Sequence, residues 1–425
     1  MDIGDAPEEA AFRDQARSWL AAHATPRGGP PPAGGLEAHV ARTMAWQRML
    51  HEHGWAGLSW PQEFGGRGLS VGFASIFNEE MVSFEETTGP LTVALGMVGP
   101  TLMAHGTETQ QHHLAAILRG DELWCQLFSE PGAGSDLATL GTKAVRDGDT
   151  WVVSGQKVWT SLAQFARYGI LLARTDPDVP KHAGLTYFIV DMQDPGIEIR
   201  PLVQMTGHAH FNETFLDEVR IPHENVVGDV GDGWSVARTT LNSERSSIAG
   251  GGAGWSVEAL IEAARTMCVS DDPLVRQQLA AAHSRALILT AMAYRVRSAV
   301  SHGRLPGAEV LAMKLGYANH WVATMETAMQ ILGADGLLYE SESESEIDGD
   351  ETDDDPAGAA AGNAPEPDSG PRLGSSWQHA LLNQFAIRLG GGTDEVQRNI
   401  IGELGLGLPR EPSADRGVPW KDLPR

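Results

Sequence analysis

Cysteine, long apolar runs and basic residues are all scarce in this chain. The 425 residues include 2 cysteines, Cys125 and Cys268, which show neither metal-ligand spacing nor a disulfide framework. Because thiols stay reduced inside cells, we expect a cytoplasmic protein. No run of about 18 apolar residues occurs, so no membrane-spanning helix is predicted. The N-terminus is acidic (Met-Asp-Ile-Gly-Asp-Ala-Pro-Glu-Glu), unlike a signal or transit peptide.

The shortage of positive charge bears on partners. Lys and Arg number 31 against 56 Asp and Glu, a formal net charge of −25 at pH 7. Nucleic-acid binding needs basic patches that neutralise phosphates, so we expect no nucleic-acid partner.

Much of the negative charge is gathered in one segment. Ten of the 16 residues in 340–355 are acidic, and the stretch 340–374 has few large apolar side chains. Such a sequence buries too little surface to offset the entropy of ordering it. We expect a disordered, solvated insertion at 340–374. The alternative, an acidic segment that binds a partner, stays open.

The rest of the chain changes its hydrophobic period twice. Helical spacing at 6–24, 37–53 and 70–118 gives way after residue 124 to short β-branched and aromatic runs, and helical spacing returns at 236–266, 273–302 and 306–332. We therefore expect three domains and a tail, at 1–120 (α-helical), 121–232 (antiparallel β), 233–408 (a helical bundle that contains the insertion) and 409–425.

Two segments carry the chemistry. Leu127–Asp136 (Leu-Phe-Ser-Glu-Pro-Gly-Ala-Gly-Ser-Asp) places hydroxyls and carboxylates around a glycine-rich turn, where the backbone can approach a ligand closely. Gly155–Ser161 (Gly-Gln-Lys-Val-Trp-Thr-Ser) ends a predicted strand in an indole and two hydroxyls. Alone, the first is a common surface turn and the second a core tryptophan at a strand end. Together they indicate a binding site.

Both segments resemble the flavin-binding segments of the acyl-CoA dehydrogenase family. The Gly54–Ser70 loop and the C-terminal motifs Gln330–Gly336 and Gly390–Ile401 resemble the same family, so the likeness spans nearly the whole chain except the acidic insertion. It implies an acyl-CoA dehydrogenase-like α+β fold with an N-terminal α-helical domain, a middle antiparallel β-domain and a C-terminal four-helix bundle. The periodicity predicts the same order.

The resemblance also implies FAD as cofactor and acyl-CoA as substrate. Ser135 would lie where thioester and flavin meet, Trp159 would cover one face of the ring, and Ser161 would hydrogen-bond flavin N5, which needs a short donor because it accepts a hydride. The other residues implied to bind FAD are Gln126, Phe128 and Ser129 along the ring, Gln330 and Gly333 at a neighbouring subunit's pyrophosphate, and Thr393 and Gln397 near the adenosine.

One departure from the family's sequence pattern is relevant to how subunits assemble. The family's Arg-x-x-Phe motif ahead of its second bundle helix is absent, and residues 272–279 are Asp-Pro-Leu-Val-Arg-Gln-Gln-Leu. This resembles a branch in which two different subunits combine and bind fewer flavins than chains. We expect a homo-oligomer or a hetero-oligomer with a related subunit, and an electron-transfer flavoprotein or similar electron acceptor.

The catalytic base follows from the resemblance. Many members carry a glutamate directly before the Gly-Thr of the C-terminal motif, where this chain has Gly391. Others carry it on a bundle helix directly before an arginine, which matches Glu244-Arg245 here. We expect Glu244 to be the base, with a pKa raised by burial, and Arg245 to orient the substrate or the helix. The alternative is an exposed Glu-Arg pair on a helix.

Two other functions stay open. The chain could be a non-catalytic subunit of a heteromeric dehydrogenase, which the missing Arg-x-x-Phe favours, or a flavin monooxygenase or oxidase on the same scaffold, which Glu244 disfavours.

Gly391 leaves room where other members have a side chain, so we expect a branched or bulky acyl group such as a sterol side chain.

Overall fold

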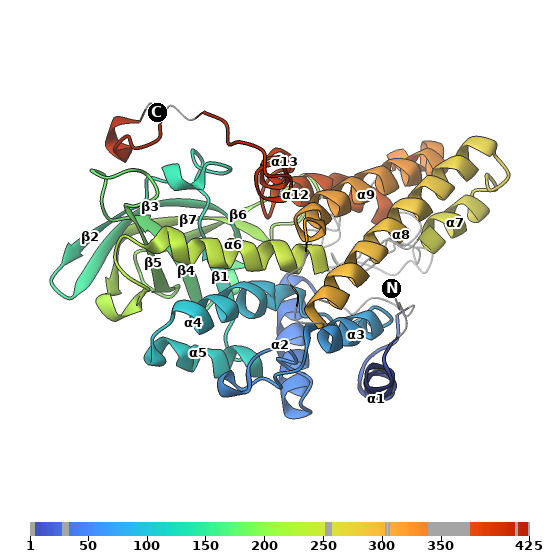
Figure 1. The fold of residues 1–425 in the computed structure, drawn as a ribbon, viewed down its shortest axis with the longest axis horizontal. Helices are drawn as coiled ribbons and strands as arrows, with labels where there is room; N and C mark the ends of the chain where they lie inside the picture. Colours follow the sequence, from blue (N-terminus) through green and yellow to red (C-terminus); the bar gives the residue numbers. More distant parts are fainter. Residues whose placement is uncertain are drawn as a thin grey trace, which may run out of the picture.

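A computed structural model describes residues 5–27, 34–250, 257–301, 304, 307–338, 375–412 and 415–423. Helices at the N-terminus, a twisted sheet in the middle and further helices at the C-terminus follow one another along the chain (Figure 1). The expected disordered insertion at 340–374 lies outside the described residues.

The N-terminal region is helical. Its helices are α1 (Pro7–His23), α2 (Leu36–Glu52), α3 (Val71–Met81), α4 (Gly99–His105) and α5 (Glu108–Arg119). In α1 the apolar positions at helical spacing, Phe12, Ala16 and Leu20, are all buried, as the periodicity predicts.

An eight-stranded sheet forms the middle region. The strands are β1 (Trp124–Leu127), β2 (Lys143–Asp147), β3 (Thr150–Ser161), β4 (Tyr168–Arg174), β5 (Leu185–Asp191), β6 (Ile197–Leu202), β7 (Phe211–Pro222) and β8 (Val226–Val227). Their order is β6-β7-β3-β2-β4-β5-β8, with β1 beside β4. Most neighbours are antiparallel, as expected, but β4 runs parallel to β1 and, at one residue pair, to β2.

The C-terminal region is helical again. Its helices are α6 (Gly233–Gly250), α7 (Val257–Thr266), α8 (Pro273–Ser301), α9 (Glu309–Leu332), α11 (Ser375–Leu382), α12 (Gln384–Leu389) and α13 (Asp394–Ile400). The helical spacing read over 236–266 is matched by α6 and α7, and residues 251–256 between them lie outside the described residues.

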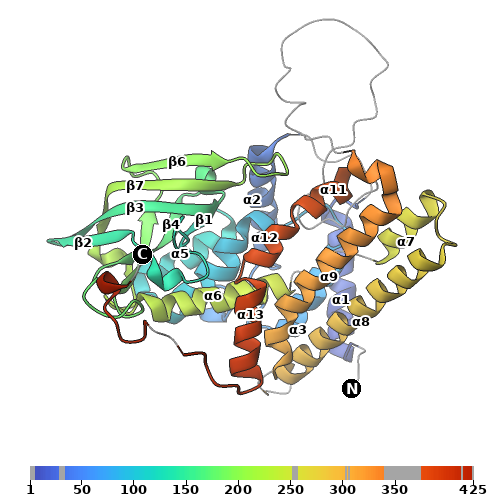
Figure 2. The ribbon, with the colours of Figure 1, turned by 90° about the horizontal axis from the view of Figure 1, so that it is seen from above.

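Helix α6 joins the three regions. It crosses the sheet and runs above α4 and α5 in Figure 1. One hydrophobic cluster includes Leu102 of α4, Leu114 of α5, Tyr187 of β5 and Val236 of α6, each no more than 2% exposed. In Figure 2 the same helix extends from the sheet to α9 and α13. Residues near its C-terminal end therefore lie where the sheet meets the C-terminal helices.

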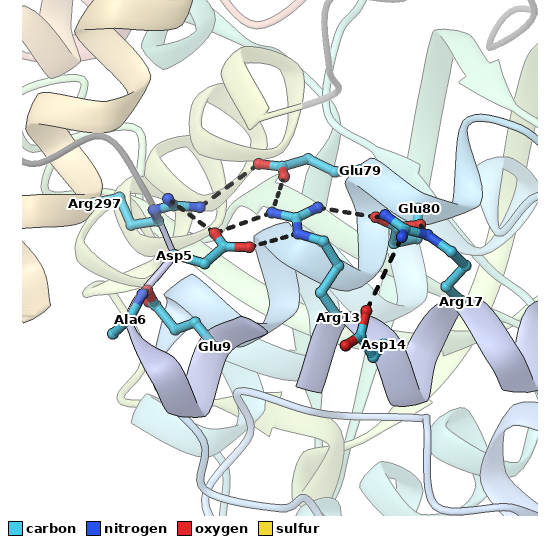
Figure 3. A network of polar contacts seen from close by, with 9 residues as sticks. All are labelled: Asp5, Ala6, Glu9, Arg13, Asp14, Arg17, Glu79, Glu80 and Arg297. Carbon is cyan, nitrogen blue, oxygen red and sulfur yellow. Dashed lines mark hydrogen bonds and ion pairs between the residues drawn. The ribbon is translucent and has the colours of Figure 1, made fainter. Parts of the chain in front are cut away.

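Ion pairs fasten the N-terminal helices to the C-terminal ones. Arg13 of α1 pairs with Asp5 (2.6 Å), Glu79 (2.7 Å) and Glu80 (3.0 Å) (Figure 3). Arg297 of α8 reaches Glu79 at 3.6 Å and Asp5 at 3.8 Å. The network thus spans α1, α3 and α8.

Within the described residues no helix is long and apolar enough to cross a membrane, and no group of His, Cys, Asp and Glu could hold a metal ion. Both cysteines are free thiols, Cys125 buried and Cys268 exposed.

Candidate active site

The middle of α6 is held from both sides by buried hydroxyls of α4 and β5. Thr240 contacts Thr101 of α4 at 2.8 Å and the Tyr187 hydroxyl of β5 at 3.0 Å. Thr240 is fully buried, so these bonds are costly to break. They fix the position of the next helical turn, which carries Glu244.

Glu244 lies where α6 meets the C-terminal glycine motif. The backbone N–H of Gly391 donates to Glu244 Oε1 at 3.0 Å. Burial raises the pKa of Glu244, while a hydrogen bond from Gln126 of β1 and the Gly391 amide oppose the rise. The structure thus brings together three expected site residues, Gln126, Glu244 and Gly391, from three distant parts of the chain.

A buried lysine supports this arrangement. Lys314 of α9 is 2% exposed, and its Nζ donates to the Gly392 carbonyl at 2.7 Å. Burial lowers the pKa of Lys314, and its positive charge in turn lowers the pKa of Glu244. Lys314 was not among the residues predicted from the sequence. Its spacing could have indicated burial, because Lys314 lies on the same face of α9 as the buried residues Ala318, Trp321 and Met325.

Two backbone positions of the C-terminal motif Gly390–Ile401 favour glycine. Gly391 and Gly392 have φ of 64° and 94°, a region that side chains with a Cβ rarely adopt. Gln397 is 1% exposed and donates to the Gly391 carbonyl at 2.8 Å, so in this chain its amide holds the loop. Thr393 caps α13 through a bond from the Val396 amide at 3.2 Å.

The segments Leu127–Asp136 and Gly155–Ser161 lie side by side. The Val158 amide donates to the Ser129 carbonyl at 2.9 Å, and the buried Lys157 Nζ donates to the Phe128 carbonyl at 3.0 Å and to Glu130 at 2.9 Å. The Phe128 side chain points into the core, where its ring meets Tyr187 edge-on. Lys157, like Lys314, was not predicted from the sequence.

The Trp159 side chain is exposed rather than buried. It lies within an irregularity of the β3–β7 pairing, has φ of 62°, and its indole is 58% exposed, with its edge toward Phe211. A positive φ in a bulky residue is strained and persists where the surroundings enforce it. The core-tryptophan alternative is therefore excluded.

The surroundings of Trp159 fit a flat aromatic cofactor. Ser161 is half-buried, two residues beyond the indole in the same strand. On the adjoining turn Ser135 is exposed, and a Cβ added at Gly132 or Gly134 would meet nothing within 4 Å. An exposed indole, short hydroxyl donors and an open glycine turn are what an isoalloxazine ring needs.

Some expected residues lie elsewhere. Gln330, which contacts Gln278 of α8, and Gly333 are exposed at the C-terminal end of α9. Gln330 follows Lys314 by 16 residues, about 24 Å along a helix, so this chain does not bring it to Glu244. Arg245 is half-buried, donates to Asn242, and has its pKa lowered by burial.

Family models match the chain along nearly its whole length. Residues 6–121 match "Acyl-CoA dehydrogenase, N-terminal domain", residues 125–219 the middle domain and residues 231–406 the C-terminal domain of the same family.

Individual proteins agree. Acyl-CoA dehydrogenase IpdE1 of Mycobacterium tuberculosis is 39% identical over 411 residues, which cover 94% of this chain and 98% of the relative. A solved structure described as a Tcur3481-Tcur3483 steroid ACAD matches with a TM-score of 0.76 at 31% identity, over 97% of this chain and 100% of that one. The ChsE4-ChsE5 complex from Mycobacterium tuberculosis gives 0.75 at 30% identity, over 97% and 100%.

Proposed function

The chain belongs to the acyl-CoA dehydrogenase family, as the sequence resemblance predicted, and we propose that it dehydrogenates an acyl-CoA thioester between Cα and Cβ with Glu244 as the base. The family's cofactor is FAD, which when bound supplies the hydride acceptor. The helical–β–helical fold class is confirmed with the family.

The observation that carries the assignment of the base is the contact between Glu244 and Gly391. The two sequence positions at which the family places its glutamate are 147 residues apart, yet the Glu244 carboxylate lies 3.0 Å from the Gly391 amide. A glutamate from α6 thus supplies a carboxylate at the place that Gly391 leaves without one. Its pKa, raised by burial, suits removal of a proton from a weak carbon acid.

Other residues have supporting roles in this proposal. Trp159 provides a wall for the flavin ring, Ser161 a donor at N5, and Ser135 a contact to the thioester. Gln126 links β1 to Glu244 and holds its carboxylate in place. Arg245, the next residue of α6, has the role of orienting the substrate, since its bond to Asn242 stays within the same helix.

A bulky acyl group is the proposed substrate class. Gly391 has no side chain to occupy the space beside Glu244, and two similar solved structures are described as steroid ACADs. We propose a branched or polycyclic acyl chain, such as a degraded sterol, with an electron-transfer flavoprotein as the acceptor of electrons.

Anaerobic flavin bleaching tests the proposal. The purified holoprotein is mixed with octanoyl-CoA, isobutyryl-CoA and the CoA thioester of a steroid side-chain acid, and absorbance near 450 nm is followed. We expect fastest bleaching by the steroid thioester. Bleaching by none of the three, with oxygen consumed in the presence of a reductant, would favour a monooxygenase or oxidase.

A non-catalytic subunit is the second candidate. Two of the similar solved structures are described by pairs of chain names, as Tcur3481-Tcur3483 and as the ChsE4-ChsE5 complex. Flavin that binds to this chain alone but is not bleached by any thioester would support that candidate.

A further inference from the structure

The C-terminal tail returns to the sheet after the last helix. In Figures 1 and 2 the dark red segment that contains residues 415–423 lies by the strands, away from α13. Main-chain bonds attach it to the loop between β4 and β5: the Trp420 amide donates to the Val179 carbonyl at 2.9 Å and the Lys421 amide to the Pro177 carbonyl at 3.1 Å. Residues 415–423, called here the C-terminal strap, are thus anchored at a defined place.

Trp420 extends from the strap to the glycine-rich turn that carries Ser135. Its indole Nε1 donates to the Thr139 carbonyl at 3.0 Å. The guanidinium carbon of Arg174 lies 4.7 Å from the centre of the Trp420 ring, within the range of a cation–π contact. One side chain of the strap therefore contacts both the turn and the cation beneath it.

Arg174 holds the same turn from below. It is 3% exposed, and its Nη2 donates to the Ala138 carbonyl at 2.5 Å and to the Leu140 carbonyl at 3.4 Å. Because Trp420 covers this guanidinium, its removal would expose Arg174 to water and weaken both bonds.

A second connection runs through Lys181 of the β4–β5 loop. Its Nζ lies 2.7 Å from Asp136 and 2.5 Å from Asp415, so one ammonium group joins the turn to the strap. Asp136 directly follows Ser135 in the sequence. The strap thus contacts residues on the C-terminal side of Ser135 in two ways, directly through Trp420 and indirectly through Lys181.

The part of the turn directly before Ser135 is rich in glycine. Gly132 and Gly134 flank Ala133, and glycine backbones are the freest to move. Glu130 and Ala133 exchange two backbone bonds of 3.0 Å on the N-terminal side of Ser135, and on its C-terminal side the amides of Thr139 and Leu140 donate at 3.0 and 3.1 Å in the segment that the strap contacts.

We propose that the C-terminal strap positions the Ser135 turn and thereby sets the affinity for acyl-CoA, without acting on the proton transfer to Glu244. Trp420 is the main positioning residue, because it joins the strap to both the turn and Arg174. The effect on affinity rests on the proposed dehydrogenase function; the effect on the turn does not.

The test uses the full-length holoprotein with Trp420→Ala, Trp420→Phe and the control Lys421→Ala. Lys421 is the neighbouring strap residue, but its side chain pairs with the exposed Asp178 and not with the turn. Steady-state kinetics use the thioester that bleaches the wild-type flavin fastest. For Trp420→Ala we expect KM to rise about tenfold with kcat within about twofold. Trp420→Phe keeps a ring but loses the indole N–H donor, so its KM should lie between those of wild type and Trp420→Ala. Lys421→Ala should have the KM of wild type.

Hydrogen exchange gives a readout independent of turnover. The amides of Thr139 and Leu140 donate to the Asp136 and Leu137 carbonyls within the turn. They should exchange several-fold faster in Trp420→Ala and at the wild-type rate in Lys421→Ala. Unchanged exchange in Trp420→Ala would overturn the positioning role, and faster exchange with unchanged KM would overturn the link to affinity. If wild type bleaches with no thioester, the proposed function fails while exchange still decides whether the strap holds the turn.

Discussion

Replacing Glu244 by glutamine removes the proton acceptor and little else. The amide oxygen of glutamine can still accept the 3.0 Å bond from Gly391, and the side chain keeps its length, so the loop and the flavin should stay in place. The loss should therefore fall on the chemical step.

The size of the loss follows from the role of a general base. Such a group contributes about 10²- to 10⁴-fold to a rate, which corresponds to about 3–5 kcal/mol of barrier. No other carboxylate among the described residues is held against the Gly391 amide, so we expect the upper part of this range, about 10³-fold or more in kcat.

The assay is the rate of anaerobic flavin bleaching by a saturating acyl-CoA, measured across pH. In wild type the rate should fall as pH drops through the raised pKa of Glu244, because the protonated carboxyl cannot accept the proton. Glu244→Gln should lose this acid limb and keep wild-type FAD content. Glu262→Gln, an exposed α7 glutamate paired with Arg265, is the control and should behave as wild type. More than about a tenth of wild-type activity in Glu244→Gln would refute the assignment of the base.

Further outcomes concern the surroundings of the site, stability and assembly. Lys314→Met removes a cation that lowers the pKa of Glu244, so the acid limb of the pH–rate profile should move to higher pH; an unmoved limb would contradict the electrostatic link. Gly391→Glu should reduce turnover of bulky thioesters, measured by flavin bleaching, because a side chain there adds strain at a φ of 64° and fills the space beside Glu244; faster turnover would count against this view. Arg13→Ala should cost about 1–2 kcal/mol, seen as a lower Tm at low salt and a smaller difference from wild type in 1 M NaCl; a salt-independent difference would exclude an ionic origin. Expressed alone, the chain should be a homo-oligomer that retains FAD weakly, or should need a second related chain; native mass and FAD per chain decide between them, and a fully active, flavin-replete monomer would contradict both.

Local signals in the sequence predicted much of the architecture. Periodicity located α1 and the strands β3 to β6 because burial on one face imposes a repeat of about 3.6 or 2 residues. Its helical prediction over 236–266 is matched by α6 and α7 on either side of residues 251–256, which lie outside the described residues. Strands β1, β2, β7 and β8 were not predicted. Three of them have only two to five residues, and in the 12-residue β7 buried positions are taken by the polar Asn212 and Thr214, so no continuous apolar run marks the strand.

Of the site, the sequence by itself determined the residue types, since Glu244 and the glycines of the C-terminal motif follow from the family pattern that the chain carries. Tertiary structure alone decided which of them meet. Glu244 and Gly391 are joined by one hydrogen bond across 147 residues, Lys314 is buried beneath the loop, and the strap lies against the turn of Ser135. Contacts of this kind depend on how helices and sheet pack, and the periodicity of any single segment records only which face is buried.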